Sequence, residues 1–380
     1  MNFDLTDNQR MIRDMVREFA ENEIAPVAGK HDAEHTFPEA TAKRMGELGL
    51  FGITVPEAYG GPGADYVSFG LAAEEIARHC ASHSVIYGAS ASLTVGPILG
   101  WGTEEQKQTY LPPMAQGTAM GCYALTEPEA GSDAGSLKTS ATREGDEYVI
   151  NGQKVFISNG AVADTCIIFA RTDPKSTDAR GVSAFIVDTK SEGFNVGKNE
   201  EKLGLNASLT NQLFFDNLRV PAENILGKEG DGFKVAMSTL DTGRVMAAAG
   251  SVGIARAAME DSIAYAKERH QFGKPIAANQ AIQWKLADMD VHVEAGRNLY
   301  LKAATLKDQN KPFTHAASRA KLFCSEMAMK ATIEGVQIHG GNGYTKDYNV
   351  ERYMRDIKIF EIFEGTSEVQ RMVIARHLLA

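Results

Sequence analysis

A carboxylate stands beside a glycine near the end of the chain, in residues 362–368 (Ile-Phe-Glu-Gly-Thr-Ser-Glu). The carboxylate of Glu364 could act as a general base if it lay in a dry site that raised its pKa. The same residues could instead begin a helix, because Thr366 or Ser367 makes a good N-cap and acidic residues favour the positive end of a helix dipole. Taken alone, the stretch fits both a catalytic base and a solvated acidic residue.

A second stretch suited to binding is residues 123–133 (Tyr-Ala-Leu-Thr-Glu-Pro-Glu-Ala-Gly-Ser-Asp). Its glycine and small hydroxyl groups would allow backbone N–H groups and side-chain Oγ atoms to approach the edge of a ring or an oxyanion. A polar crossover from a strand into a loop would have a similar composition. Both interpretations fit this stretch when it is considered by itself.

Two further stretches combine polar side chains with glycine. Residues 269–275 (Arg-His-Gln-Phe-Gly-Lys-Pro) are followed by Gln280, and Arg269 could bind a pyrophosphate through paired hydrogen bonds, with the Gln280 amide as a further donor. A helix C-terminus with stabilising cations and a glycine cap fits the same residues. In residues 337–344 (Gln-Ile-His-Gly-Gly-Asn-Gly-Tyr), the glycines would let the backbone come very close to a ligand, and a tight turn between helices would look the same.

Several common site patterns are missing from the sequence. There is no G-x-G-x-x-G after a strand and no G-x-x-x-x-G-K-[ST], which disfavours a Rossmann or P-loop nucleotide site. The G-x-S-x-G and H-E-x-x-H patterns of serine hydrolases and zinc proteases are also missing. The four cysteines have neither a Cys-x-x-Cys pair nor a histidine at metal spacing, so we expect no metal site and no disulfide framework. Reduced thiols are typical of a cytoplasmic protein.

Length and charge limit the class of protein further. A chain of 380 residues is long enough for two or three domains, since single cores stop growing near about 250–300 residues. The formal net charge of −10 argues against a nucleic-acid partner, because the phosphate backbone is also negative. The chain starts without a basic segment followed by an apolar core, and it has no apolar run of about 20 residues, so we expect neither a signal peptide nor a membrane span.

Residues 1–120 read as helices. Thr6 and Gln9 have the spacing of a capping box ahead of an apolar pattern of helical period, which Pro26 should end or kink. The long apolar segment 66–101 has helical character and few charges, which predicts burial between other helices.

Residues 121–230 read as strands, because short alternating apolar runs are separated by turn residues. Asn151-Gly152 lies between residues 147–150 and 153–157, and this pair accepts the positive φ angles of a type I′ turn. We therefore predict a hairpin at this pair.

From residue 231 to residue 380 the helical period returns. The predicted helices cover residues 233–269, 278–307, 314–339 and 369–379. The order is therefore helices, strands and helices, which predicts an α+β, mainly helical fold.

Together, the four stretches resemble the acyl-CoA dehydrogenase family, the FAD-dependent flavoproteins that desaturate acyl-CoA thioesters. The resemblance covers essentially the whole chain in the family's order, with one signature in residues 125–133 and another running from residues 337–344 to Glu364-Gly365-Thr366. It implies an N-terminal helical domain over residues 1–120, a middle β domain over 121–230 and a C-terminal four-helix bundle over 231–380. It also implies a homotetramer, built as a dimer of dimers, in which each FAD site is completed by a second subunit.

Site residues are carried over by position. The resemblance implies that the FAD held by the same subunit would contact Tyr123, Leu125, Thr126, Gly131, Ser132, Phe156, Ile157, Ser158, Thr366 and Glu368. The FAD of a neighbouring subunit would be reached by Arg269, Phe272, Gln280, Gln337, Gly340 and Gly341. The acyl-CoA substrate would contact Ser132, Asp241, Arg244 and Gly365.

The family's reaction assigns a role to Glu364. Removal of the weakly acidic α-proton of a thioester needs a carboxylate of raised pKa in a dry site, together with donors to the thioester carbonyl. In the family those donors are the N–H of the base itself and a ribityl hydroxyl of FAD, and the β-hydrogen leaves as hydride to flavin N5. Gly365 would leave room for the thioester.

The sequence departs from some branches of the family. Gly243 stands where the isovaleryl and long-chain branches carry their basic glutamate, so Glu364 is the single candidate base. Ser84 stands, as aligned, where glutaryl-type enzymes carry an arginine that binds a carboxylate, which disfavours a dicarboxylyl substrate. Phe363 replaces the tyrosine usual before the base, and Phe156 replaces the tryptophan of some members.

The resemblance therefore predicts a short-chain acyl-CoA dehydrogenase that passes electrons to an electron-transferring flavoprotein. Three alternatives stay open at this point. The same chemistry could run in reverse as an enoyl-CoA reductase in complex with that flavoprotein, the fold could serve as a non-catalytic acyl-CoA-binding scaffold, or the protein could be an oxidase that uses oxygen.

Overall fold

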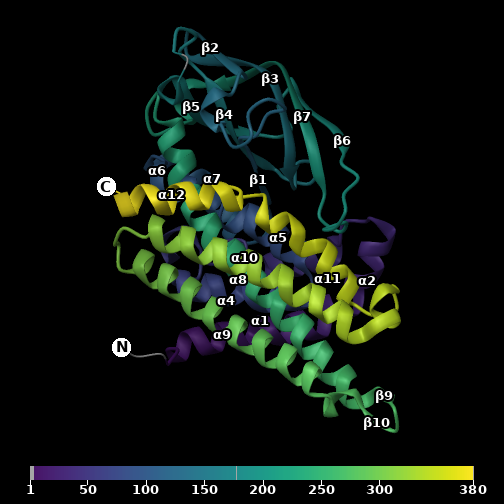
Figure 1. Cartoon of the computed structure of the whole chain (residues 1–380). Helices are drawn as coiled ribbons and strands as arrows, with labels where there is room; N and C mark the ends of the chain where they lie inside the picture. The colour runs from purple at the N-terminus through teal and green to yellow at the C-terminus, as the bar shows by residue number, and fades with distance from the viewer. Residues whose placement is uncertain (1–3, 177, 380) are drawn as a thin grey trace.

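A computed structural model describes residues 4–176 and 178–379 and shows a sheet set on one end of a helical body (Figure 1). The N-terminal helices are α1 (Asp7–Phe19), α2 (Ala25–Glu34), α3 (Glu39–Glu47), α4 (Tyr66–His79), α5 (Ala81–Ala91), α6 (Val95–Trp101) and α7 (Glu104–Ala115). The apolar segment 66–101 forms three of them, and α4 and α5 are buried along almost their whole length, as predicted.

The helix boundaries follow the capping and proline signals with one exception. The capping box of Thr6 and Gln9 is formed, which confirms the predicted start of α1. A π turn (Ala20–Ile24) precedes Pro26, so the proline enters the first turn of α2. A proline inside a helix usually breaks it, but α7 continues through Pro112 and Pro113 to Ala115. A proline removes one donor and need not end a helix that is almost complete.

The middle part of the chain forms a sheet of eight strands. They are β1 (Gly121–Ala124), β2 (Ser140–Glu144), β3 (Glu147–Ser158), β4 (Thr165–Arg171), β5 (Val182–Asp188), β6 (Phe194–Asn199), β7 (Thr210–Pro221) and β8 (Ile225–Leu226). The order is β6-β7-β3-β2-β4-β5-β8, and β1 pairs in parallel with β4. One face of this sheet forms its own apolar core, and the other packs against α6, α7 and the start of α8.

The predicted hairpin at Asn151-Gly152 is wrong. Both residues lie inside β3, and the turn between β2 and β3 is made at Gly145, whose φ is +66°. Gly152 has a φ of +150° at a shift in register against β7, and a Cβ there would lie 2.5 Å from Oγ1 of Thr139. The Asn-Gly pair therefore serves a β-bulge, which needs the same glycine freedom as a tight turn.

The C-terminal part forms α8 (Gly232–Glu268), α9 (Gln280–Asp308), α10 (Thr314–His339), α11 (Val350–Ile357) and α12 (Ser367–Leu379). The short hairpin of β9 (His270–Gln271) and β10 (Lys274–Pro275) joins α8 to α9. Helices α8, α9 and α10 share one apolar core with α1, α4 and α5 of the N-terminal part. The two helical parts therefore fold against each other as one body.

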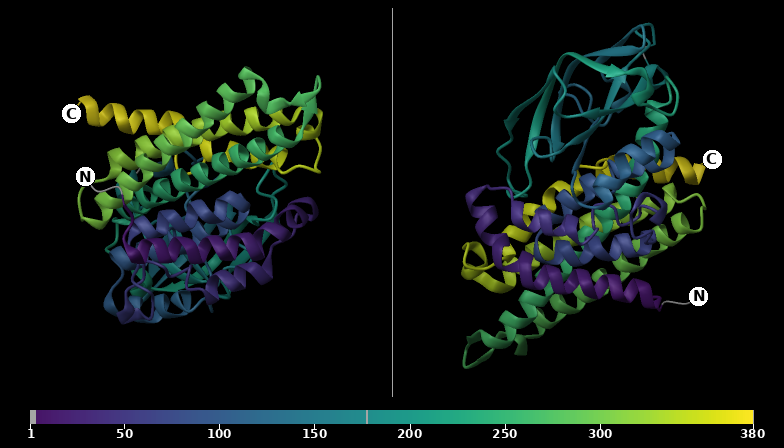
Figure 2. Two further views of the ribbon diagram at one scale, coloured as in Figure 1. Left: turned by 90° about the horizontal axis from the view of Figure 1, so that it is seen from below. Right: turned by 180° about the vertical axis from the view of Figure 1, so that it is seen from behind.

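The arrangement places the two ends of α8 far apart. The start of α8 lies under the sheet, and the β9–β10 hairpin lies at the opposite end of the helical body (Figures 1 and 2). Helix α12 crosses the helical body on the side nearest the sheet. No helix within residues 4–176 and 178–379 is long and apolar enough to cross a membrane.

Candidate active site

The backbone around Glu364 is unusual. The short 3₁₀ turn η8 (Lys358–Glu361) precedes this segment, and α12 follows it. Glu364 and Gly365 both have positive φ angles, +56° and +89°. Oγ1 of Thr366 accepts a hydrogen bond of 3.2 Å from the Val369 N–H, so Thr366 caps α12. The cap and the carboxylate are thus different residues, and Glu364 turns away from the helix start.

Glu364 is not a solvated surface acid. The residue is half-buried, but its Oε2 is sealed from solvent and accepts no hydrogen bond from the described residues. Its N–H also donates to no described group. A carboxylate and an N–H of one residue that both lack partners among the described residues suit the paired roles of base and oxyanion donor.

Three side chains hold the backbone of this segment. Nε of Arg244 and Nε2 of Gln370 donate to the Glu364 carbonyl over 3.3 and 3.0 Å. Nε2 of Gln370 also donates to the Gly365 carbonyl over 2.9 Å, and Nζ of Lys321 donates to it over 2.7 Å. These side chains come from α8, α12 and α10. They hold carbonyls rather than the carboxylate, so the carboxylate stays free to accept a proton.

Burial sets the proton affinity of Glu364. Loss of hydration raises its pKa to about 7, while the positive charges of Arg244 and Lys321 act in the opposite direction. A base whose pKa lies near neutrality combines a usable ionised fraction with a strong affinity for the proton it removes.

We expect kcat/KM for an acyl-CoA substrate to rise with pH through about 7. The reason is that only the ionised carboxylate can take the α-proton, and a raised pKa moves ionisation upward from the usual value of a glutamate. A pH profile of kcat/KM checks this. A profile that is flat across roughly pH 6 to 8 would contradict the pKa of the assigned base.

Gly243 lies directly against this carboxylate. A Cβ built at Gly243 would stand 2.4 Å from Oε2 and 2.6 Å from Cδ of Glu364. A side chain at position 243 would therefore occupy the same space as the Glu364 carboxylate. The resemblance placed the alternative basic glutamate at this position. Any side chain at position 243 would meet the Glu364 carboxylate, which explains the glycine there.

We expect Gly243→Ala to lower kcat by displacing the Glu364 carboxylate, with a smaller change in substrate affinity. The neighbour has to move because heavy atoms this close to a Cβ are not tolerated. Rapid-reaction measurement of flavin reduction checks the chemical step directly. Gly100→Ala is the control, because Gly100 is exposed in α6, a Cβ there meets nothing within 4 Å, and the residue is not among the predicted site residues. Equal rates in wild type and Gly243→Ala would contradict the close contact.

The backbone turn by itself requires a glycine at position 365. It has a φ of +89°, which favours glycine, and a Cβ would lie 2.7 Å from Nε2 of Gln370. Its missing side chain therefore first serves the backbone turn and the contact with Gln370. The role of Gly365 in making room for a thioester stays a prediction.

Asp241 and Arg244 form a buried ion pair one turn along α8. Nη1 of Arg244 lies 2.6 Å from Oδ1 of Asp241, and the hydroxyl of Thr314 donates to Oδ2. Burial raises the pKa of Asp241, while Thr314 and Arg244 oppose that shift. The pair fixes the guanidinium that in turn holds the Glu364 carbonyl.

Tyr123 of β1 brings the sheet to the same place. Its hydroxyl is sealed from solvent and has no hydrogen-bond partner among the described residues. Burial raises the pKa of Tyr123, and the charge of Glu364 adds to the shift, so the two side chains lie near each other. An unpartnered buried hydroxyl is costly unless a ligand completes it.

The predicted binding loop after β1 is anchored by a buried ion pair. Nζ of Lys154 lies 2.8 Å from Oε1 of Glu127 and 3.1 Å from the Leu125 carbonyl. The other bonds to Glu127 come from the N–H groups of Lys138 and Thr139 over 2.6 and 2.9 Å. Sequence reasoning missed Lys154. A lysine in the middle of an otherwise alternating strand was the available signal.

This loop lies beside the end of β3. The Val155 N–H donates to the Thr126 carbonyl over 3.0 Å, which places Phe156 next to the loop. Phe156 has a φ of +60° and is 65% exposed. Gly131 and Ser132 are exposed, while Ile157 is buried and Ser158 is half-buried. An exposed aromatic ring held beside small residues leaves a flat apolar surface open to a ligand.

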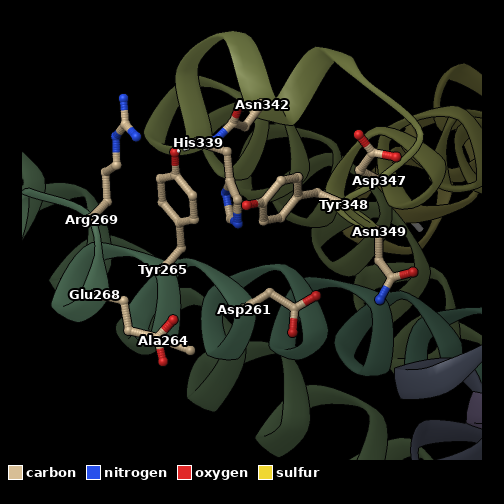
Figure 3. Close-up of a pocket in the computed structure, with 10 residues that line it drawn as sticks. All are labelled: Asp261, Ala264, Tyr265, Glu268, Arg269, His339, Asn342, Asp347, Tyr348 and Asn349. Carbon is tan, nitrogen blue, oxygen red and sulfur yellow. Dashed lines mark hydrogen bonds between the residues drawn. The ribbon is translucent and has the colours of Figure 1, made fainter.

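The other predicted cofactor residues lie elsewhere. Figure 3 shows a groove of about 430 Å³ at the end of α8, lined on one side by Arg269 and Tyr265 and on the other by His339 and Tyr348. The rings of Tyr265 and His339 stack with centroids 4.3 Å apart, and Nδ2 of Asn342 donates to the Tyr265 hydroxyl over 2.9 Å. Arg269 extends from its rim (Figure 3).

The second group of predicted cofactor residues shares high exposure. It comprises Arg269, Phe272, Gln280, Gln337, Gly340 and Gly341. Phe272, at the tip of the β9–β10 hairpin, has a φ of +51° and is 98% exposed. One chain thus separates the predicted residues into a group near Glu364 and a group at the far end of α8 (Figure 1).

The final predicted contacts lie at the start of α12. Thr366 and Glu368 line a second groove of about 310 Å³. Hydrogen bonds, first to its own backbone N–H and then to Thr366, lower the pKa of the exposed Glu368. Glu368 is therefore a ready acceptor of hydrogen bonds next to residues 362–367, which we name the base segment.

The residues around β1, the end of β3 and Glu364 fit a flavin. The buried hydroxyl of Tyr123 and the N–H of Glu364 lack partners, the Phe156 ring is exposed, and the space around Gly131 is open. These are donors and an apolar face suited to a polar ring edge and a flat ring surface.

Three family models match successive parts of the chain. They are described as the N-terminal domain of acyl-CoA dehydrogenase over residues 6–118, the middle domain over 122–218 and the C-terminal domain over 230–379. The chain is 51% identical over 375 residues to the short-chain specific acyl-CoA dehydrogenase of Clostridium acetobutylicum, with 99% of each chain covered. It is 47% identical to the mitochondrial short-chain specific enzyme of Rattus norvegicus, covering 99% of this chain and 91% of the relative.

Solved structures agree with these matches. Butyryl-CoA dehydrogenase from Megasphaera elsdenii superposes with a TM-score of 0.98 at 46% identity, covering all of both chains. A chain in a structure described as electron transferring flavoprotein of Acidaminococcus fermentans gives a TM-score of 0.98 at 48% identity, again over all of both chains. A glutaryl-CoA dehydrogenase from Mycobacterium smegmatis, in complex with FADH2, gives a TM-score of 0.93 at 33% identity, covering 98% of this chain and 95% of that one.

Proposed function

Because this chain belongs to the acyl-CoA dehydrogenase family, we propose that it oxidises a short-chain acyl-CoA thioester to the trans-2-enoyl-CoA with FAD as cofactor. The expected family and the expected α+β, mainly helical fold are both confirmed. The chain is an enzyme of the acyl-CoA dehydrogenase class. The observation that carries the proposed mechanism is the buried, unpartnered carboxylate of Glu364 against Gly243.

In the proposed reaction, the residues of the chain handle the α-proton. Glu364 takes that proton on its carboxylate, and its own N–H donates to the thioester carbonyl as negative charge develops there. Arg244 and Gln370 donate hydrogen bonds to the Glu364 carbonyl and so keep that carbonyl turned away from the substrate. When bound, FAD supplies the acceptor for the β-hydrogen, which leaves as hydride. The residues that would hold the FAD are Tyr123, Leu125, Thr126, Gly131, Ser132, Phe156, Ile157, Ser158, Thr366 and Glu368.

Substrate length is proposed from the relatives and from the site. The two relatives named short-chain specific match 99% of this chain and are 51% and 47% identical to it. Ser132, Asp241, Arg244 and Gly365 are proposed to contact the acyl-CoA. Ser84 is fully buried and small, and it offers no positive charge to a second carboxylate. We therefore favour a straight short acyl chain over a dicarboxylyl one.

An anaerobic titration of the purified protein with a panel of acyl-CoA thioesters tests the function. Butyryl-CoA should bleach the flavin fastest, whereas longer, branched and glutaryl thioesters should act more slowly. A protein without flavin absorbance would support a scaffold instead. Rapid formation of peroxide in air would support an oxidase.

The direction of the reaction and the electron partner are part of the proposal. We propose that electrons pass to an electron-transferring flavoprotein in the cytoplasm. A chain of similar sequence occurs in a structure described as that flavoprotein from Acidaminococcus fermentans, which supports this partner. Reduced enzyme mixed with crotonyl-CoA separates the two directions, because rapid reoxidation would favour an enoyl-CoA reductase.

We further propose that the residues at the far end of α8 complete the cofactor site of a second subunit in a homotetramer. Arg269 is exposed at the C-cap of α8, and Phe272 is exposed in the turn of the β9–β10 hairpin, which lies at the end of the helical body away from the sheet (Figure 1). An aromatic ring that is 98% exposed at a hairpin tip is typical of a side chain that packs on a partner.

Mixed oligomers test this arrangement. We expect Arg269→Ala and Glu364→Gln each to be nearly inactive, and we expect activity to return when both chains are assembled together. The reason is that one site of the mixed oligomer then combines an intact Glu364 with an intact Arg269 from the other chain. The control joins wild type with the double variant, where no such site forms between unlike chains. Absence of recovery in the first mixture would show that Arg269 acts within its own chain.

A further inference from the structure

Lys321 is a fully buried lysine that the mechanism above uses only as a backbone anchor. It lies in the first third of α10, among the buried residues Ala317, Ala320, Cys324 and Ala328, and its residue exposure is 0%. Within the described chain it forms no ion pair, and its Nζ donates to the Gly365 carbonyl over 2.7 Å. An ammonium is costly to bury unless it has such partners, so its position in the core needs an explanation.

The bond from Lys321 falls on the strained part of the base segment. Glu364 adopts a φ of +56°, which is unfavourable for a residue with a side chain, and Gly365 follows at +89°. Such a conformation is stable when several surrounding groups hold the same backbone atoms. Lys321 and Gln370 both hold the Gly365 carbonyl, and Arg244 and Gln370 both hold the Glu364 carbonyl.

The charge of Lys321 also reaches the carboxylate. Among the described residues, the charges of Arg244 on α8 and Lys321 on α10 act on Glu364, and the charge of Glu364 acts on the Tyr123 hydroxyl of β1. The charges of Glu361 and Glu368 act on Lys321 as well. Burial lowers the pKa of Lys321 to about 8, and the charge of Glu364 opposes that shift. Lys321 makes no direct contact with the carboxylate, so its charge favours ionisation without blocking the oxygens that must accept a proton.

We propose that Lys321 is a positioning residue for dehydrogenation: its ammonium fixes the Gly365 carbonyl so that the neighbouring Glu364 carboxylate faces the substrate, and it places a fixed positive charge beside these two residues. This inference rests on the proposed role of Glu364 as the base. Lys321 itself touches neither substrate nor the transferred hydrogens. A purely structural lysine would instead stabilise the core without changing the titration of Glu364.

Three measurements on the holoenzyme test the inference in Lys321→Met, Lys321→Arg and a control. An infrared titration follows the Glu364 carboxyl, identified by its loss in Glu364→Gln. Hydrogen–deuterium exchange follows the backbone of residues 362–367, and the pH profile of kcat/KM follows catalysis. Lys311→Met is the control, because it removes the same unit of charge at an exposed position. The Lys311 Nζ donates to the Gln309 side chain.

We expect Lys321→Met to raise the titration midpoint of Glu364 by about one pH unit or more, as loss of a nearby opposite charge does. Exchange in residues 362–367 should become faster, and the acidic limb of kcat/KM should move upward by the same amount. Lys321→Arg should keep the midpoint close to wild type but lower kcat, because the charge remains and the larger group displaces the carbonyl. Lys311→Met should match wild type in all three measurements.

An unchanged midpoint together with unchanged exchange in Lys321→Met would overturn the inference. If that variant does not fold, Lys321→Gln replaces the ammonium with a neutral donor, and a wild-type midpoint there would overturn the role of the charge. A midpoint that moves while the acidic limb of kcat/KM stays in place has a different meaning. It would support the placement of Lys321 and would overturn the proposed role of Glu364 as the base.

Discussion

Glu364→Gln is expected to slow reduction of the flavin by butyryl-CoA by about 10²- to 10⁴-fold, the range typical of removing a general base. The amide keeps the size of the side chain but cannot take the α-proton. The clamp on the backbone should survive, because Arg244, Lys321 and Gln370 hold carbonyls rather than the carboxylate. Substrate affinity should therefore change much less than the rate of the chemical step.

Anaerobic rapid mixing separates these two quantities, since it measures flavin reduction without the electron acceptor. Glu361→Gln is the matched control. Glu361 lies three residues before Glu364 in η8, pairs with Lys358, is not among the predicted site residues, and loses the same charge. A near wild-type rate of bleaching in Glu364→Gln would rule out Glu364 as the base. Equal losses in both variants would point to a general effect of charge in this segment.

Glu364→Gln should also stabilise the fold above neutral pH. The folded pKa of about 7 lies above the ordinary value of 4.5, so the folded state holds a proton that the unfolded state has released in this window. Stability therefore falls as pH rises from about 4.5 to 7, and the loss is complete above that range. The glutamine variant should not show this fall, which denaturant unfolding at several pH values would measure alongside the kinetics.

Lys154→Met is expected to destabilise the protein by about 3–5 kcal/mol, the range for breaking a buried ion pair from one side. The pair lies inside the sheet, with Lys154 at 0% and Glu127 at 7% exposure. Without the ammonium, Glu127 keeps the N–H groups of Lys138 and Thr139 but loses its balancing charge. Because Lys154 also holds the Leu125 carbonyl, the loop after β1 should loosen and retain the flavin less tightly.

Denaturant unfolding and the rate of flavin loss on dilution check the two effects of this variant. Lys138→Met is the matched control, since Lys138 pairs with Glu129 on the same loop in full contact with solvent, and we expect little change there. The double variant Glu127→Gln/Lys154→Met should recover part of the lost stability, because it leaves no unpaired charge. Equal stability of Lys154→Met and wild type would show that the pair does not hold this loop.

Local patterns predicted most of the helices and the order of the parts. The capping box of Thr6 and the helix over residues 314–339 were predicted from periodicity and capping, and both are found. The hairpin at Asn151-Gly152 failed because the pattern detects freedom at φ, and a bulge uses that freedom as well as a turn does. The long-range partner strand β7 decided between them.

The sequence by itself determined which chemical groups are available at this site and their order along the chain. It contained one candidate base at Glu364, glycine at 243 and 365, and the loop that follows β1. It could not determine that a Cβ at Gly243 would touch a carboxylate 121 residues later, because packing of α8 against the base segment sets that distance.

Only the tertiary structure decided how these groups are tuned. Burial raises the pKa of Glu364, and Lys321, which sequence reasoning passed over, reaches the base segment from another helix. The tertiary structure also separates the predicted cofactor residues into two groups at opposite ends of α8 (Figure 1). Desolvation and charge–charge distances depend on which elements pack together, and local residue patterns do not encode them.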